Sequence, residues 1–182
     1  GAKVCGHDAT SWLAAELQRA QFYVNALSLY VLRQRKDKTT ESNWNLQILI
    51  GVGLHAQYKN WEHLEDWQDG SGQNIDLQGC ATSGCRKTFT ICGKCVSWAA
   101  IGNIVYGVAS ARTGTSWEMT LFGAKVAKFV ASPFAGWSDI PSEDTNAYKF
   151  GIATNMNMYF VTDVEELRRV LCRRMDEAES KG

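Results

Sequence analysis

The stretch Gly102-Asn103-Ile104-Val105-Tyr106-Gly107 decides how the middle of this chain is interpreted. Its two glycines permit a positive φ or a close approach of another backbone, while the Asn and Tyr side chains can hydrogen-bond a ligand. Two interpretations follow. The glycines are helix-packing or turn residues beside a core tyrosine, or they form a tight backbone that presents Asn103 and Tyr106. The spacing also occurs by chance, so the neighbouring segments must decide.

The segments around this stretch predict a mainly helical domain. Apolar residues recur at helical spacing in the segments 12–31, 96–111, 117–130, 142–150 and 163–171. The first is amphipathic and ends in the basic run Arg33-Gln34-Arg35-Lys36, which suits the negative end of a helix dipole. Ser142 is expected to cap the fourth helix, and Pro133 and Gly136 to end the third.

The length of the chain limits the number of domains, and its charge limits the classes of partner. With 182 residues the chain has the size of one domain, so we expect residues 1–182 to form a single compact unit. The 19 Lys and Arg residues balance the 19 Asp and Glu residues, which leaves no global basic field to attract phosphate backbones. No apolar run is long enough to span a membrane. We expect a monomer with no nucleic acid and no membrane among its partners.

Six cysteines, an even number, predict a disulfide framework in a secreted, extracellular protein. They are Cys5, Cys80, Cys85, Cys92, Cys95 and Cys172. The sequence does not decide their pairing, although a bond between Cys5 and Cys172 would tie the termini to the body. The four central cysteines are expected to staple a loop, which a short β-hairpin through Thr88-Phe89-Thr90-Ile91 would complete.

A zinc site is the competing interpretation of the four central cysteines, because Cys92-Gly93-Lys94-Cys95 is like the knuckle of a small zinc module. Against zinc, the ligand spacing is not a usual pair of short steps, and two cysteines would be left over. His7, His55 and His63 do not have metal-ligand spacing either. We therefore expect no metal and no cofactor.

Two groups of carboxylates are candidates for chemistry. Glu16 lies beside the apolar stripe of the first helix, one turn from Trp12, where a carboxyl would be half-buried and its pKa raised by desolvation, as a general acid requires. Asp139, Glu143 and Asp144 lie in the Pro-containing segment Asp139-Ile140-Pro141-Ser142-Glu143-Asp144. The simpler interpretation of both groups is solvated surface carboxylates, with Ser142 or Asp144 capping a helix.

These carboxylates suit glycoside cleavage, which needs one protonated carboxyl at the leaving oxygen and usually a second, ionised one. Seven tryptophans and six tyrosines add flat faces that suit sugar rings. Two other function classes stay open. A His–Glu ribonuclease pair could use His55 or His63 with Glu16, and a non-enzymatic, disulfide-rich secreted effector would need none of these carboxylates.

A resemblance to a known family favours the first of these classes. The order of Trp12-Leu13-Ala14-Ala15-Glu16-Leu17, Trp44-Asn45-Leu46, Gly102–107 and Asp139–144 with Gly151 resembles the polymorphic toxin type 44 domain, from about residue 12 to residue 151. Cysteine-rich secreted relatives of this size look like the catalytic domains of fungal muramidases. The resemblance implies an antibacterial hydrolase of lysozyme type that cleaves the glycan of peptidoglycan.

On that resemblance, Glu16 matches the family's first-helix glutamate and acts as general acid, assisted by Asp139 or Asp144. Asn103, Tyr106, Trp44 and Trp137 are expected to contact the substrate. One departure concerns Trp44-Asn45-Leu46-Gln47, since bacterial members tend to carry an Asp and a Lys where this chain has Asn45 and Gln47. We expect Glu16, Asn103, Tyr106 and the 139–144 loop to face one another across a groove.

Overall fold

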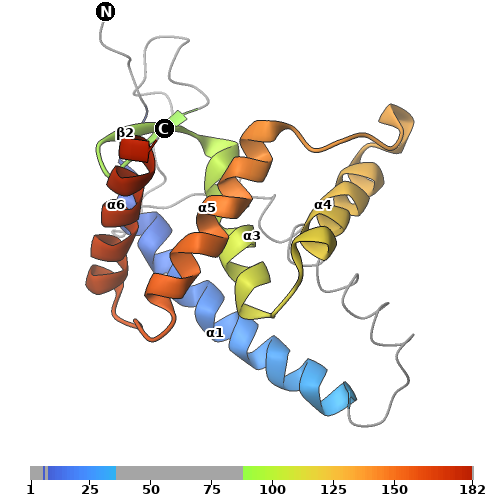
Figure 1. Ribbon diagram of the computed structural model, residues 1–182, viewed down its shortest axis with the longest axis horizontal. Coiled ribbons are helices and arrows are strands. Elements are labelled where there is room, and N and C mark those ends of the chain that lie inside the picture. The colour runs from blue at the N-terminus through green and yellow to red at the C-terminus, as the bar shows by residue number, and fades with distance from the viewer. Residues whose placement is uncertain (1–5, 7, 36–87, 182) are drawn as a thin grey trace, which may run out of the picture.

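The computed structural model describes residue 6, residues 8–35 and residues 88–181 (Figure 1). Within these ranges the chain is mainly helical with one two-stranded antiparallel sheet, which confirms the expected fold class. The elements in chain order are α1 (Thr10–Arg35), β1 (Thr88–Ile91), β2 (Lys94–Ser97), α3 (Trp98–Arg112), α4 (Trp117–Ala131), the 3-10 helix η4 (Pro133–Ala135), α5 (Ser142–Met158) and α6 (Val164–Lys181).

Two glycines let α3 and α5 cross with their backbones in contact. A Cβ atom at Gly107 would overlap the carbonyl oxygen of Tyr148 and lie 2.9 Å from its carbonyl carbon. A Cβ atom at Gly151 would overlap the carbonyl oxygen of Ile104 in the same way. For Gly107, the interpretation as a helix-packing glycine is therefore confirmed, and both residues are needed because only glycine lacks the clashing atom.

The helices α3 and α5 run side by side in the same direction (Figure 1). At their N-terminal ends, Asn103 Nδ2 donates to Asp144 Oδ1 over 2.8 Å. At their C-terminal ends, the Arg112 guanidinium donates to the carbonyl oxygens of Met158 and Tyr159 over 3.3 and 3.2 Å. Polar contacts therefore hold both ends of the pair, and the glycine crossing holds its middle.

The first helix packs on α3 and α6. Its buried face carries Leu13, Leu17 and Ala20, the residues that the apolar spacing predicts. Gln21, buried beside these residues, donates through Nε2 to Met158 O over 3.3 Å, and Gln18 Nε2 donates to Thr162 O over 2.6 Å. These bonds attach α1 to the connection between α5 and α6.

The predicted hairpin through Thr88–Ile91 is confirmed. Thr88 pairs with Ser97 and Ile91 with Lys94, so a two-residue turn joins β1 to β2. Both turn residues, Cys92 and Gly93, have positive φ angles of 52° and 75°, as a tight hairpin turn that follows the twist of its strands requires. Because β2 continues to Ser97, α3 begins two residues later than the predicted start at residue 96.

The last helix runs back past α1 toward the hairpin (Figure 1), so Cys172 reaches the hairpin turn. It forms a disulfide with Cys92, with the two Cα atoms 5.2 Å apart. The pairing of Cys5 with Cys172 is therefore wrong. The four-thiolate zinc site is wrong as well, because Cys92 and Cys95 are both disulfide-bonded. Cys5, Cys80 and Cys85 lie outside the described residues.

Two helix starts can be compared with the sequence. The Asp163 carboxylate accepts a hydrogen bond from Glu166 N over 3.0 Å, so Asp163 caps α6 at the predicted position. The expectation that Ser142 caps α5 is wrong. Pro141 precedes the first turn, its carbonyl oxygen accepts from Thr145 N over 3.1 Å, and Ser142 is the first helical residue.

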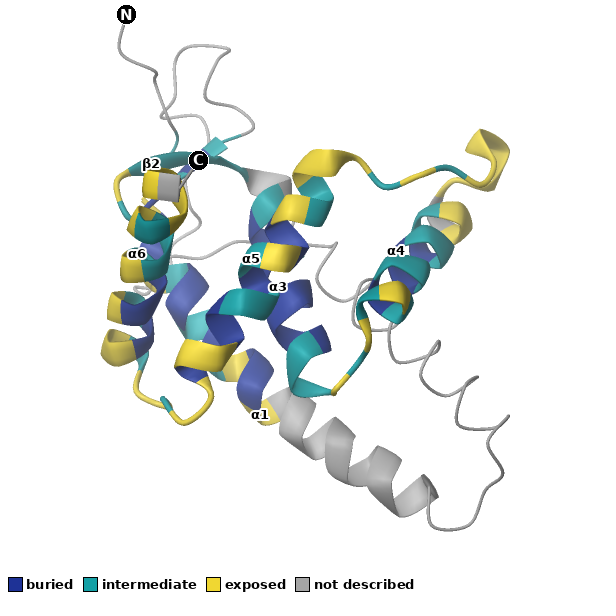
Figure 2. Cartoon of the chain, in the orientation of Figure 1, coloured by how far each residue is buried: buried dark blue, intermediate teal, exposed yellow. Residues whose placement is uncertain are grey.

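The fourth helix lies outside the pair formed by α3 and α5. Its first turn is attached to α3 because Tyr106 Oη donates to the carbonyl oxygen of Thr120 over 2.8 Å. Beyond this contact, α4 leads to η4, whose residues are all exposed (Figure 2). None of the described helices is long and apolar enough to cross a membrane.

Replacing Gly107 with Ala tests the helix crossing. We expect the free energy of unfolding to fall by about 3 kcal/mol, because the added methyl group forces the backbones of α3 and α5 apart. Denaturant unfolding measures the change. Asn146→Ala, at an exposed position of α5, is the control and should stay within about 0.5 kcal/mol of the parent. A Gly107→Ala protein as stable as the control would contradict the close crossing.

Candidate functional site

Glu16 is the first-helix carboxylate, and its side chain is only 13% exposed. The expectation of a half-buried carboxyl is therefore confirmed, and the alternative of a fully solvated glutamate is not. Arg19, one turn along α1, places Nη1 3.3 Å from Glu16 Oε2. Burial raises the pKa of the Glu16 carboxyl, and the charge of Arg19 offsets only part of this rise.

The direction of Glu16 follows from helix geometry. Glu16 and Gln18 are two residues apart, about 200° around the axis of α1, so their side chains leave the helix on opposite sides. Gln18 is bound to Thr162 O at the start of α6. Glu16 therefore points away from the connection between α5 and α6. Trp12, one turn before Glu16, packs against the hydrophobic core.

Asn103 and Asp144 form the contact that joins two of the predicted site residues. The amide of Asn103 comes from the second turn of α3, and the carboxylate of Asp144 comes from the first turn of α5. Both side chains are half-buried. An acidic residue in a first turn is favoured by the helix dipole, and the bond from Nδ2 fixes the orientation of this carboxylate.

Tyr106 does not line a site. Only 1% of it is exposed, its ring packs edge-on against Tyr148 with centroids 5.1 Å apart, and its hydroxyl donates to Thr120 O. Burial raises the pKa of the phenol. The expectation that Tyr106 contacts substrate is wrong, because on a helix Tyr106 falls beside the packing residue Gly107 and on the inner side of α3.

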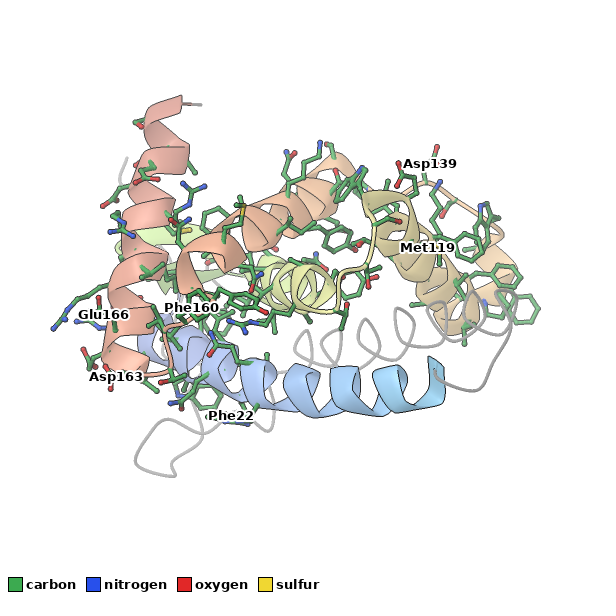
Figure 3. The ribbon with its side chains drawn as sticks, turned by 60° about the horizontal axis from the view of Figure 1, so that its bottom comes forward. Phe22, Met119, Asp139, Phe160, Asp163 and Glu166 are labelled. Carbon is green, nitrogen blue, oxygen red and sulfur yellow. A yellow bond between two sulfur atoms is a disulfide. The ribbon has the colours of Figure 1, made fainter. Side chains whose placement is uncertain are left out.

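Asp139 lies apart from the pair formed by Asn103 and Asp144. Its side chain is 94% exposed, and its Oδ1 accepts a hydrogen bond from Lys125 Nζ over 2.8 Å. The hydrogen bond and the charge of Lys125 lower the pKa of Asp139, so its carboxylate stays ionised and turned toward α4 (Figure 3). The side chain of Asp139 thus contacts α4, whereas Asp144 belongs to α5 and contacts α3. The two carboxylates therefore do not form one site.

The two predicted tryptophans cannot be treated alike. Trp137 lies half-exposed between two rings of α4, with centroid distances of 5.8 Å to Phe122 and 6.1 Å to Phe129. Trp44 lies outside the described residues, as do His55 and His63. The expectation of one groove lined by Glu16, Asn103, Tyr106 and the whole acidic loop is thus wrong for Tyr106 and Asp139.

Two residues that act on these carboxylates were not among the predicted site residues. Arg19 and Lys125 each pair with a candidate acid, and they change its pKa. The spacing of three residues between Glu16 and Arg19 was a readable signal, because such pairs are neighbours on a helix. The pairing of Lys125 with Asp139 had no local signal. Among the described residues, no three His, Cys, Asp or Glu side chains gather as metal ligands.

Comparisons of the chain with family models, with curated proteins and with solved structures find no match.

The raised pKa of Glu16 predicts a pH-dependent gain of stability in Glu16→Gln. The folded protein holds this proton more tightly than the unfolded chain does. The free energy of unfolding therefore falls as pH rises from the ordinary value of 4.5 through the raised folded pKa. Gln cannot ionise and lacks this loss. Relative to the parent, Tm of the variant should be higher at about pH 7 than at about pH 3.

Thermal melts at both pH values measure this difference. Glu165→Gln is the matched control, because Glu165 forms an equivalent pair with Arg168 on the exposed surface of α6, where its side chain is 62% exposed. Its effect on Tm should be small at both pH values. A Glu16→Gln protein whose Tm relative to the parent is the same at both pH values would show that Glu16 is not desolvated.

Proposed function

We propose that this protein is a secreted peptidoglycan hydrolase of muramidase type, in which Glu16 is the general acid and Asp144 the second carboxylate. The observation that carries the proposal is the half-buried Glu16, 13% exposed, whose pKa burial raises despite the nearby Arg19. A carboxyl in this environment keeps a proton at a pH where surface carboxylates have lost theirs.

The chemistry assigns a different task to each carboxylate. Glu16, in its protonated form, donates its proton to the glycosidic oxygen as the bond to the leaving sugar breaks. The transition state carries positive charge on the sugar ring, which an ionised carboxylate stabilises. Asp144 suits this second task because Asn103 orients it with a charge-assisted hydrogen bond of 2.8 Å.

Two further features support the proposal. The motifs that resemble the type 44 toxin domain include Glu16, Asn103, Asp144 and both crossing glycines, so the resemblance covers the proposed acids and the scaffold between α3 and α5. The disulfide between Cys92 and Cys172 supports secretion, because such bonds persist in oxidising compartments. The ribonuclease alternative depends on His55 or His63, which lie outside the described residues.

Charge-neutral variants test the two acids. Glu16→Gln should lower the rate of lysis of bacterial cell walls at least about a hundredfold, because proton donation to the leaving oxygen is lost. Asp144→Asn should also lower the rate. Turbidity loss and the release of new reducing ends measure the activity. Glu143→Gln is the matched control, since Glu143 is the exposed neighbour of Asp144 in the first turn of α5.

Full lysis by Glu16→Gln would remove Glu16 from the mechanism. Cleavage of RNA by the parent, lost in Glu16→Gln and accompanied by no lysis of cell walls, would replace the muramidase proposal with the ribonuclease alternative. A protein that acts on neither polymer but retains its biological effect in the Glu16→Gln and Asp144→Asn variants would be a binding effector.

Arg19→Gln separates a general acid from a structural glutamate. Arg19 is 75% exposed, so the variant should fold, and its loss removes the charge that lowers the pKa of Glu16. The pKa of Glu16 then rises further. Because only protonated Glu16 donates, the high-pH limb of the kcat profile should move to higher pH.

Cell-wall lysis measured across pH tests this shift. Arg168→Gln, which removes the same kind of helix pair on α6, should leave the limb in place. If the high-pH limb of the kcat profile does not move in Arg19→Gln, a group other than Glu16 determines that limb.

A further inference from the structure

The far end of α4 carries a cluster of exposed apolar side chains, which we call the α4 tip. It consists of Phe129, Val130, Phe134 and Trp137, whose exposed fractions are 40%, 67%, 104% and 54%. Phe134 belongs to η4, and at 104% nothing covers it on any side. Figure 2 shows that the exposed residues continue from the end of α4 through η4. Large apolar side chains gathered in this way mark a surface that contacts a protein, a ligand or a membrane.

The α4 tip is held in place by hydrogen bonds. Gly136 N donates to Pro133 O over 3.2 Å, and Gly136 has a positive φ of 73° that turns the chain back after Phe134. The returning chain is tied to α4 because Lys125 and Lys128 donate to the side chain and the backbone carbonyl of Asp139. Phe134 therefore projects into solvent from a turn that these hydrogen bonds fix.

The charge around the α4 tip comes from two lysines and one carboxylate, that of Asp139. Lys125 and Lys128 are the only charged residues in the segment 121–138. Both ammonium groups lie at Asp139, which supplies a single carboxylate, so one positive charge is left over. With Asp139 included, the α4 tip therefore combines exposed aromatic rings with an excess of one positive charge.

A second exposed phenylalanine provides an internal comparison. Phe160, between α5 and α6, is 90% exposed. The acidic residues Asp163 and Glu166 follow it at the start of α6, and Figure 3 shows all three at the opposite side of the view from Asp139. An exposed phenylalanine thus occurs once near two lysines and Asp139, and once near carboxylates of which Glu166 pairs with Arg169.

We propose that the α4 tip docks the protein on an anionic phospholipid surface. Phe134 and the exposed edge of Trp137 would enter the boundary between headgroups and acyl chains, where aromatic side chains are favoured. Lys125 and Lys128, one or two turns behind, would lie near the lipid phosphates. Phe134 stands without covering neighbours, so its whole ring is available to enter a lipid boundary.

This surface contact differs from a membrane span. The expectation of no membrane partner rests on the absence of an apolar run that could cross a bilayer. Peripheral docking needs only a few apolar side chains together with positive charge. The chemistry assigned to Glu16 and Asp144 uses no residue of the α4 tip, although the proposal gives Trp137 a lipid contact in place of the expected substrate contact.

Vesicle flotation tests the proposal. The parent protein should bind vesicles of phosphatidylglycerol and phosphatidylcholine and should bind vesicles of phosphatidylcholine alone more weakly. Phe134→Ser should lower the partition coefficient roughly tenfold. Phe160→Ser, the matched control with the acidic surroundings, should leave it unchanged. Lys128→Gln should lower it about fivefold, and added salt should weaken the binding of the parent.

Three results would overturn the proposal. One is equal binding by Phe134→Ser and the parent, and another is equal binding of the parent to anionic and neutral vesicles. The third is a concentration-dependent dimer in sedimentation that Phe134→Ser abolishes while vesicles stay unbound, which would make the α4 tip a contact between two copies. Glu16→Gln should bind vesicles as the parent does, so failure of the muramidase proposal leaves this test intact.

Discussion

The close contact between the backbones of α3 and α5 is the constraint on which the rest of the described structure depends. Gly107 and Gly151 leave no room for a side-chain carbon, so the two helices can approach only in the register that sets Gly107 against Tyr148 and Gly151 against Ile104. That register brings Asn103 to Asp144 at one end. A shift of one helix past the other would break that bond before it changed the apolar core.

The outer helices are attached to this pair by polar bonds and by one covalent bond. Gln18 and Gln21 hold α1 to the end of α5 and the start of α6, and they leave Glu16 on the other side of α1. The disulfide between Cys92 and Cys172 joins α6 to the hairpin, whose Cys92 N also donates to Thr10 Oγ1 at the start of α1 over 2.8 Å. The helix α1 is therefore fixed at its start and on the face opposite Glu16. The desolvation of Glu16 depends on this placement of α1.

The sequence predicts the features that follow from residue spacing, which are helix positions and burial. It misses the features that depend on how the elements pack in three dimensions. Apolar periodicity predicts where the five described α-helices begin to within two residues, but its segments stop eight residues short of the end of α5 and ten short of the end of α6. The position of Glu16 beside the stripe of α1 correctly predicts its half-burial. The same periodicity cannot say whether Tyr106 faces a ligand or the core, because that depends on which side α5 packs. Asp139 is misassigned because its partner Lys125 lies on another element, and the pairing of Cys172 requires knowing that α6 runs back to the hairpin.

The common direction of α3 and α5 explains why α4 exists. Two neighbouring helices that run the same way cannot be joined by a short loop, so the chain must travel back along their length before α5 begins (Figure 1). The helix α4 and the loop after η4 provide this return path, and removing one turn of α4 would shorten it by about 5.4 Å. The length of α4, a helix that contributes neither Asn103 nor Asp144, therefore sets whether the start of α5 can reach α3 in the correct register.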